Sequence, residues 1–437
     1  MKLSSRVIVT FCIGGLFSCS SLAFDLNRIY QLAEQQDIQL MIAQSQLQSV
    51  STTLTQAQSA NRPQINLSAG AAYSDQDNSL TADDTLTNLT YAVNLKQNLY
   101  NTEINATKDV ASANINKAEA DYKAARQDLL VRVTEAYFNI LSAGDSVAFA
   151  QAEKKAIARQ LEQAKKRFEV GLIAITDVKE AQASYDLSVS QEIVANNTLD
   201  NTKEALQVIT GEPLTETLAT LGEALDLVIP EPANAKQWVE QAKKFNLSLV
   251  SAEAELIAAS ENRKIARSGE KPTVDFLASY QGAQIDSDNN GGFDTSDLSL
   301  SVQLNMPLYT SGRTGAVIEQ SEANYATAQN NLLLQKRLIA QQTGTAYLAV
   351  VAGIAQVNAL KQALNSTTAA LDATQAGFDV GTRTSVDVLN SLRETYRSRR
   401  DYASARYAYL INTLKLKQAA GTLSQEDLNA INQWLTP

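Results

Sequence analysis

The chain has 437 residues, a formal net charge of −10 at pH 7, two cysteines and no histidine. Both cysteines, Cys12 and Cys19, lie close to the amino terminus, so the rest of the chain lacks the commonest general base, thiolate nucleophile and zinc ligands. We therefore expect no enzyme, no cofactor and no metal site. The acidic balance also argues against a nucleic-acid partner.

Residues 1–23 have the features of a cleaved signal peptide. A basic start precedes an apolar core at 7–17, and Ser21-Leu22-Ala23 supplies the small residues that signal peptidase prefers. The alternative is a lipoprotein signal acylated at Cys19, although the bulky Phe17 is unfavourable for such a signal. We expect an exported chain that has no apolar run long enough for a transmembrane helix.

Four segments alternate apolar and polar residues with a period of two, which predicts strands at about 64–76, 87–100, 273–285 and 297–309. Their lengths are typical of outer-membrane strands. A soluble sandwich is the alternative, but four strands are few for one and are half of the smallest membrane barrel. Because lipid does not tolerate open sheet edges, a barrel must be shared between chains, with eight strands in a dimer or twelve in a trimer.

Helix-forming residues fill the chain from about Thr102 to Phe168, with almost no glycine and no proline. Apolar and small residues recur there at steps of four and three, which indicates a coiled-coil seam. The seam residues are Leu129, Val133, Ala136, Ile140, Ala143, Val147 and Ala150. The second half of the chain has its seam at Ile339, Thr343, Ala346, Val350, Gly353, Val357 and Leu360. A continuous first helix would be about 100 Å long; several shorter helices are the alternative.

The long helix is followed by RFEVGLIAITDV (167–178), and a similar segment, GFDVGTRTSVDV, recurs at 377–388. These glycines, Gly171 and Gly381, are suited to a left-handed residue after a helix. Plausible N-caps of the returning helices are Thr176 or Asp177 in the first turn and Ser385 or Asp387 in the second. Turn geometry alone explains a glycine and a cap, but not the flanking aromatic residue and arginine.

The recurrence extends over the whole exported chain with an offset of about 210 residues, which indicates a domain duplication rather than a solenoid. We expect a first repeat at 24–230 and a second at 231–437. The predicted fold is mainly α with a small β part: each chain has two β-hairpins and long coiled-coil-like helices.

Three segments carry a resemblance that covers essentially the whole exported chain: RFEVGLIAITDVKEAQASYD (167–186), VGTRTSVDVL (380–389) and ARYAYLINTLKLKQAAGTL (405–423). The chain resembles the TolC family of trimeric outer-membrane efflux channels. The resemblance implies a homotrimer in the outer membrane of a Gram-negative bacterium, with one twelve-stranded β-barrel continuous with a periplasmic α-helical barrel. Residues 212–238 would form a belt around the helices.

The resemblance also implies that both turns lie at a periplasmic tip, where they close the channel. Family gate contacts correspond to links from Asp177 to Arg383 and from Thr176 to Arg406. Phe378 stands where the family has a tyrosine, so one hydroxyl hydrogen bond must be absent or replaced.

The resemblance implies an acidic entrance ring at the tip and a docking surface for an adaptor. Asp387 and Asn390 occupy the ring positions where two aspartates are expected, so the ring would be less negative. The turns at Gly171 and Gly381 would dock the adaptor.

The function implied is a passive exit duct of tripartite efflux pumps and type I secretion, carrying drugs, amphiphiles or proteins. Its expected partners are a periplasmic membrane-fusion adaptor, an inner-membrane RND, ABC or MFS pump, and outer-membrane lipid. The alternative is a trimeric coiled-coil surface or stalk protein without channel activity.

Overall fold

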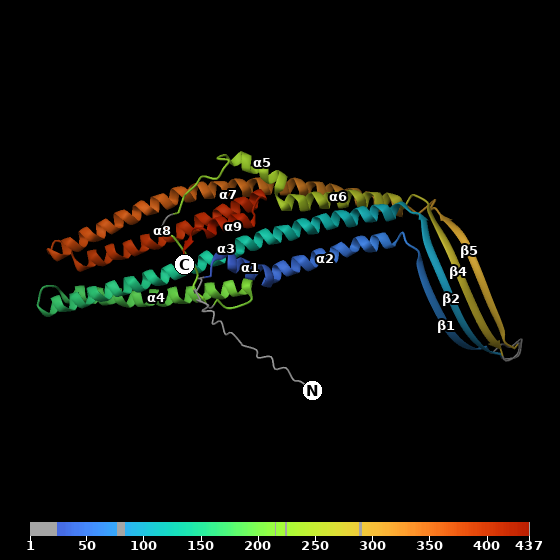
Figure 1. Cartoon of the computed structure of the whole chain (residues 1–437), viewed down its shortest axis with the longest axis horizontal. Helices are drawn as coiled ribbons and strands as arrows, with labels where there is room; N and C mark the ends of the chain where they lie inside the picture. The colour runs from blue at the N-terminus through green and yellow to red at the C-terminus, as the bar shows by residue number, and fades with distance from the viewer. Residues whose placement is uncertain (1–23, 77–83, 215, 223–224, 288–290, 437) are drawn as a thin grey trace, which may run out of the picture.

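The computed structural model describes residues 24–76, 84–214, 216–222, 225–287 and 291–436; the expected signal peptide at 1–23 lies outside the described residues. A curved sheet stands at one end of a long bundle of helices, and both helical hairpins turn at the other end (Figure 1). The first half contains α1 (Leu26–Gln36), α2 (Ile38–Ser59), β1 (Gln64–Gln76), β2 (Asp84–Tyr100), α3 (Thr102–Glu169) and α4 (Ile175–Thr210). The second half repeats this order with α5 (Ala235–Phe245), α6 (Leu247–Ser268), β4 (Thr273–Ser287), β5 (Phe293–Asn305), α7 (Arg313–Asp379) and α8 (Ser385–Ala420).

The four long strands form one antiparallel sheet in the order β1-β2-β4-β5. The register brings the predicted apolar positions together, because Leu95 lies opposite both Ile65 and Ala278, and Ala278 lies opposite Leu300. Side chains on this face are open to the surroundings: Leu67 is 74% exposed and Leu300 is 64% exposed. β1 and β5 are the two edges of the sheet and have no further partner strand in the described part of the chain.

The predicted strand boundaries agree for β1 and differ elsewhere. β2 begins at Asp84 rather than 87, and β4 extends to Ser287 rather than 285. β5 runs from Phe293 to Asn305, not from 297 to 309. Asn305 pairs with Thr273, the first residue of β4, so beyond Asn305 the chain has run past its partner strand. The proline at 307 also lacks the N–H that a ladder needs.

The two longest helices are continuous, so the alternative of several shorter helices is wrong. α3 has 68 residues and α7 has 67, which corresponds to a length of about 100 Å each at about 1.5 Å per residue. Six of the predicted first seam residues are buried, namely Leu129, Val133, Ala136, Ile140, Ala143 and Ala150. In the second seam the buried residues are Ile339, Thr343, Val350 and Val357. The seam of α7 is therefore less covered within one chain.

The expectation that no exported segment could cross a membrane as a helix was too strong. α7 contains an 18-residue window with a mean hydropathy of 1.3, of which 22% is buried in the single chain. Leu334 and Leu348 on this helix are 51% and 63% exposed. Apolar residues left uncovered along a coiled-coil helix are typical of a surface that packs against another subunit.

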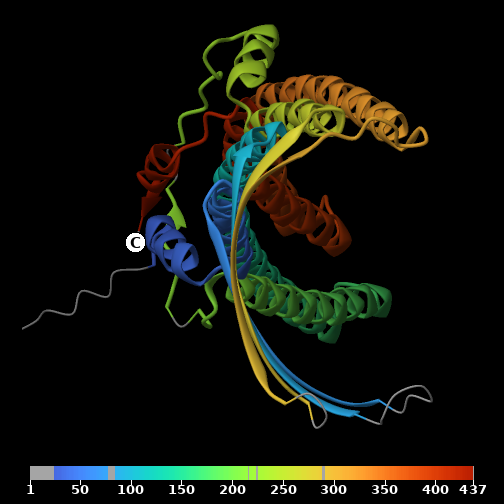
Figure 2. The same ribbon diagram turned by 90° about the vertical axis from the view of Figure 1, so that its right-hand side faces the viewer.

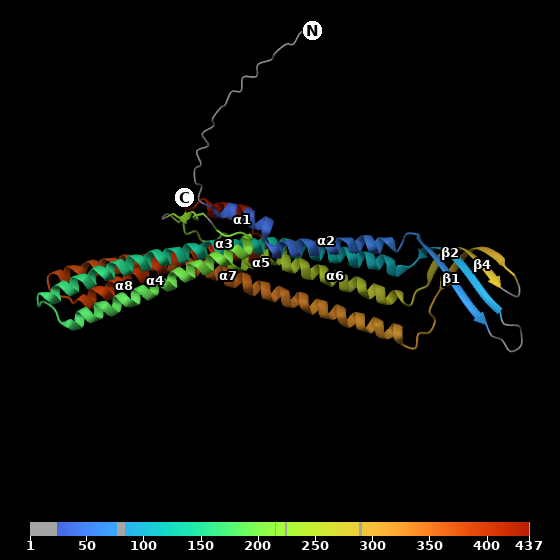
Figure 3. The ribbon, with the colours of Figure 1, turned by 90° about the horizontal axis from the view of Figure 1, so that it is seen from below.

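Short elements form a belt around the middle of the long helices. The belt consists of α1, α5, α9 (Gln425–Asn432), the small sheet of β3 (Thr220–Leu221) and β6 (Leu435–Thr436), and the segments that connect them. Seen from the sheet end, α1 and α9 lie on the convex side of the curved wall (Figure 2), and a view from below places the belt at mid-length (Figure 3). The buried Tyr137 of α3 fastens the belt, because its hydroxyl donates to the Ala219 carbonyl at 2.7 Å.

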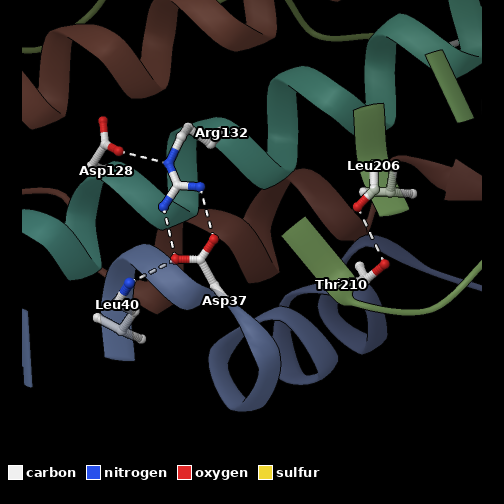
Figure 4. Close-up of polar contacts among 6 residues, drawn as sticks. All are labelled: Asp37, Leu40, Asp128, Arg132, Leu206 and Thr210. Carbon is white, nitrogen blue, oxygen red and sulfur yellow. Dashed lines mark hydrogen bonds and ion pairs between the residues drawn. The ribbon is translucent and has the colours of Figure 1, made fainter. Parts of the chain in front are cut away.

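A buried ion pair joins the α1–α2 junction to α3 (Figure 4). Asp37, 2% exposed, accepts two hydrogen bonds from the Arg132 guanidinium at 2.9 and 3.0 Å. The same carboxylate caps α2 by accepting from the Leu40 N–H at 2.8 Å. Asp128 holds the guanidinium from the other side at 2.7 Å. Burial opposes ionisation of Asp37, but the hydrogen bonds from Arg132 and Leu40 outweigh it and lower the pKa of the carboxyl.

Candidate functional site at the tip of the two helical hairpins

The two tip turns have the same backbone geometry. Gly171 and Gly381 adopt left-handed φ values of 77° and 82°, as expected for both glycines. In the first turn the Leu172 N–H donates to the Arg167 carbonyl at 2.9 Å, and in the second the Thr382 N–H donates to the Gly377 carbonyl at 2.8 Å. These are Schellman motifs, which satisfy the last carbonyls of α3 and α7. Both turns lie at the same end of the molecule (Figure 1).

The N-caps are not the residues expected. α4 begins at Ile175 after Ala174, which offers no side-chain hydrogen bond, so Thr176 and Asp177 already lie inside the first turn. α8 is capped by Thr384. Its hydroxyl accepts from the Asp387 N–H at 3.2 Å, and the Asp387 carboxylate accepts from the Thr384 N–H at 3.0 Å. This capping box was visible in the sequence as a threonine followed three residues later by an acid.

A cation–π contact connects the two hairpins at the tip. The guanidinium of Arg167, at the end of α3, lies 4.1 Å from the centroid of the Phe378 ring near the end of α7. Phe378 is 4% exposed, whereas its counterpart in the first repeat, Phe168, is 41% exposed. A cation over an aromatic face is attracted by the ring quadrupole. The contact occupies the position where the sequence predicted a lost hydroxyl hydrogen bond.

The two turns are not equivalent, because the residue that corresponds to Arg167 in the second repeat is Gly377. A Cβ at Gly377 would lie 2.8 Å from Cγ of Arg383 and 3.2 Å from the Thr382 hydroxyl. The stem of Arg383 therefore packs on the backbone of its own turn. An arginine covers the ring of Phe378 from the other hairpin, whereas no arginine of the described residues covers the ring of Phe168.

An apolar cluster holds α3, α4 and α8 together just behind the turns. Its buried residues are Ile157, Leu161, Ala164, Ala181 and Leu389. At the edge of this cluster the Gln160 side-chain amide contacts the Ser385 hydroxyl at 3.5 Å. The start of α8 is therefore fixed against α3 by packing as well as by polar contacts.

A buried carboxylate on the α3–α8 contact was not singled out from the sequence. Glu153 of α3 is 4% exposed. Burial raises the pKa of its carboxyl, while the charges of Arg400 and Arg393 on α8 act in the opposite direction. Nothing in the sequence distinguishes Glu153 from the exposed acids of the same helix, because only the contact with α8 buries it.

The residues of the expected gate pair, Asp177 and Arg383, lie at the two tip turns and form no ion pair with each other among the described residues. Thr176 and Arg383 are exposed, and Asp177 is half-buried. Among the ion pairs of the described residues, none joins Asp177 to Arg383 in the single chain.

The expected link between Thr176 and Arg406 is wrong. Arg406 lies roughly 30 Å along α8 from Ser385, at about 1.5 Å per residue, whereas Thr176 lies at the tip. Its guanidinium donates to the Gly222 carbonyl in the belt and lies 5.6 Å from the centroid of the Tyr402 ring. Arg406 is therefore a residue that fastens the belt to α8.

The two residues expected at the entrance, Asp387 and Asn390, lie in the first turns of α8. The hydrogen bonds from the Thr384 N–H and hydroxyl, helped by the charge of Arg383, lower the pKa of the Asp387 carboxyl. Asp387 is therefore ionised at neutral pH. Asn390 is exposed.

Comparison with known proteins gives the same architecture. The family model described as "Outer membrane efflux protein" matches residues 29–212 and 238–422. The chain is 37% identical to outer membrane protein TolC of Vibrio cholerae over 438 residues, covering 100% of this chain and 99% of that protein. It is 26% identical to the alkaline protease secretion protein AprF of Pseudomonas aeruginosa, covering 98% and 92%.

Among solved structures, the fold is similar to the CmeC outer membrane channel of Campylobacter jejuni, with a TM-score of 0.79 at 16% identity, covering 94% of this chain and 89% of that one. A duplicated family model that spans most of the chain agrees with the two helical hairpins and two β-hairpins described above. The chain belongs to the outer membrane efflux protein family.

Proposed function

We propose that this chain assembles as a homotrimer and forms the exit duct of tripartite efflux pumps and of type I secretion in the outer membrane of a Gram-negative bacterium. The observation that carries the proposal is the sheet, which has an exposed apolar face and two open edges, β1 and β5. Lipid does not tolerate open sheet edges, and four strands are too few to close into a membrane barrel. Pairing β5 of one subunit with β1 of the next closes three sheets into a barrel of twelve strands.

The tip is the proposed gate. Arg167 and Phe378 join the two hairpins of one subunit. Asp177 and Arg383 have no ion-pair partner within the described chain, so we assign their contact to neighbouring subunits, where threefold symmetry repeats it. Opening requires the second hairpin to move away from the first, which breaks both sets of contacts.

The partners follow from the surface of the turns. Val170, Leu172 and Val380, beside Gly171 and Gly381, are 70%, 72% and 77% exposed. Apolar side chains of this size on an exposed tip favour docking of another protein, and we assign this surface to the periplasmic membrane-fusion adaptor. The adaptor would connect the duct to an inner-membrane RND, ABC or MFS pump. The relative AprF is named as an alkaline protease secretion protein, which supports proteins among the cargoes beside drugs and amphiphiles.

The test is insertion and conductance. Removal of residues 273–309 deletes β4 and β5 and leaves a hairpin that cannot close, so we expect no heat-resistant trimers in outer-membrane fractions and no single-channel currents in planar bilayers. A control variant with Leu67→Val, a conservative change on the apolar face, should insert and conduct normally. A deletion variant that still inserts as a trimer would contradict the barrel. Wild-type trimers without currents would favour the stalk protein.

A further inference from the structure

A cavity of about 410 Å³ lies in the belt, between residues 228–231, the last turns of α8, and α9. Ligand-binding pockets usually have volumes of about 300–1,000 Å³. Both tryptophans of the chain, Trp238 on α5 and Trp434 after α9, line the cavity together with Tyr409 of α8. Tyr409 lies roughly 35 Å along α8 from the tip, so this is a second site, separate from the gate.

The polar atoms of two aromatic residues, Trp238 and Tyr409, form hydrogen bonds with the backbone of the belt. The indole N–H of Trp238 donates to the Pro232 carbonyl at 2.8 Å. The Tyr409 hydroxyl donates to the Val228 carbonyl at 3.1 Å and accepts from the Val228 N–H at 3.0 Å. These bonds fasten residues 228–232 over one side of the cavity. What remains for a ligand is ring surface, chiefly that of the half-buried Trp434, because Trp238 and Tyr409 are 5% and 4% exposed. The negative quadrupole of an aromatic face favours a cation.

The charges of the lining leave one acid uncompensated. Lys417 is paired with Asp427, and the second oxygen of Asp427 accepts from the Ser424 N–H at 2.9 Å as part of the α9 capping box. This pair is neutral overall. Glu231, which also lines the cavity, is exposed and takes part in no ion pair within the described residues.

We infer that this belt cavity binds lipophilic organic cations, with the apolar body against Trp238, Trp434 and Tyr409 and the positive charge toward Glu231. An organic anion is disfavoured because Lys417, the one cation among the described residues that line the cavity, is already neutralised. An inserted peptide is disfavoured because a cavity of about 410 Å³ has the size of a small-molecule site. The inference does not depend on export through the duct.

Because both tryptophans line the cavity, tryptophan fluorescence reports binding there directly. Full-length protein in lipid nanodiscs is titrated with benzyltriethylammonium, with excitation selective for tryptophan. We expect a saturable change in emission with this cation and none with 4-butylbenzenesulfonate, an aromatic anion of similar size, at the same concentrations. Trp434→Phe leaves Trp238 as the sole reporter and should keep the response, because the ring is retained.

Charge variants test the role of Glu231. Glu231→Gln should weaken apparent binding about two- to five-fold, the range expected for an exposed charge contact. Glu204→Gln, on the exposed surface of α4, is the matched control and should not change binding. Equal responses to the cation and the anion, no saturable response, or unchanged binding in Glu231→Gln would overturn the inference. So would an emission change that occurs only when an adaptor protein is added.

Discussion

The Arg167 guanidinium lies 4.1 Å from the centroid of the Phe378 ring, so that a charge from the first hairpin covers a buried ring from the second. This contact has no counterpart at Phe168, because the residue that corresponds to Arg167 in the second repeat is Gly377. The two hairpins of one subunit are therefore joined at the tip by a contact that only one of the two turns can make.

Removing the charge of Arg167 should loosen the closed tip. A cation–π contact stabilises by about 0.5–2 kcal/mol, and a trimer contains three copies, so Arg167→Gln should shift the equilibrium toward open states by up to several kcal/mol. Raised closed-state conductance in planar bilayers is the measurement. Phe378→Leu should have a similar effect and Phe378→Tyr almost none.

Two controls separate this contact from general effects of charge. Arg159→Gln, on the exposed surface of the same helix, should leave the conductance unchanged. Combining Arg167→Gln with Phe378→Leu should add little to either single change, because both remove one contact. Fully additive effects would show that the two residues act separately.

The contact proposed between subunits can be tested by reversing its charges. Asp177→Ala and Arg383→Gln should each raise closed-state conductance. Asp177→Arg combined with Arg383→Asp restores an ion pair of opposite orientation, so it should bring the closed-state conductance part of the way back to the wild-type value. Glutamine is chosen at 383 because the stem of Arg383 packs against Gly377 and should be kept. An exposed pair contributes only about 0–1 kcal/mol, so a measurable effect depends on the threefold repetition. Wild-type conductance in all variants would mean that packing alone closes the tip.

Asp387 completes the capping box of Thr384 at the start of α8, and we propose that it also forms a cation-attracting ring in the trimer. The low pKa of its carboxyl keeps all three copies ionised at neutral pH, so trivalent cations should block single-channel current. Asp387→Asn keeps an oxygen acceptor for the Thr384 N–H and removes the charge, so the block should disappear. Asn390→Asp should strengthen it.

Thr384→Ala separates helix capping from the proposed attraction of cations, because it removes the cap hydroxyl and keeps the charge of Asp387. This variant should lose about 1 kcal/mol of helix stability and retain the block. Equal block in wild type, Asp387→Asn and Asn390→Asp would leave Asp387 with a role in the capping box alone.

The buried pair of Asp37 and Arg132 should make the middle of the helices sensitive to acid. The folded pKa of Asp37 lies below its unfolded value of about 3.9, so its stabilisation is complete above that value and is lost as the pH falls through the folded pKa. Asp37→Ala should destabilise by about 3 kcal/mol, because it leaves Arg132 without its buried partner and α2 without its cap.

Heat unfolding followed by circular dichroism between pH 7 and pH 3 measures this effect. The variant should lose less stability than the wild type on acidification. Asp128→Asn, which removes the more exposed partner of the same arginine, should cost at most about 1 kcal/mol. If Asp37→Ala loses as much stability on acidification as the wild type, other carboxylates cause the acid sensitivity.

Local patterns were sufficient to predict that the long strands and the long helix α3 exist, although not all of their boundaries. The period of two placed β1 correctly, the steps of four and three predicted the continuous α3, and a glycine after each long helix predicted the left-handed residues at Gly171 and Gly381. These features depend on residues close in the sequence, whose side chains repeat along one face of a strand or helix. The end of β5 could not be placed in this way, because it depends on where its partner β4 begins.

Contacts between distant segments were decided only by the tertiary structure. Arg406 shares a segment with the family motif, yet the crossing of the belt over α8 places it at Gly222 rather than at the tip. The burial of Phe378 under Arg167 and the gathering of both tryptophans around one cavity depend on helices that meet far apart in the chain. Sequence periodicity specifies which face of a helix is apolar, but it does not specify which residue lies opposite, because that depends on the relative position of two packed elements.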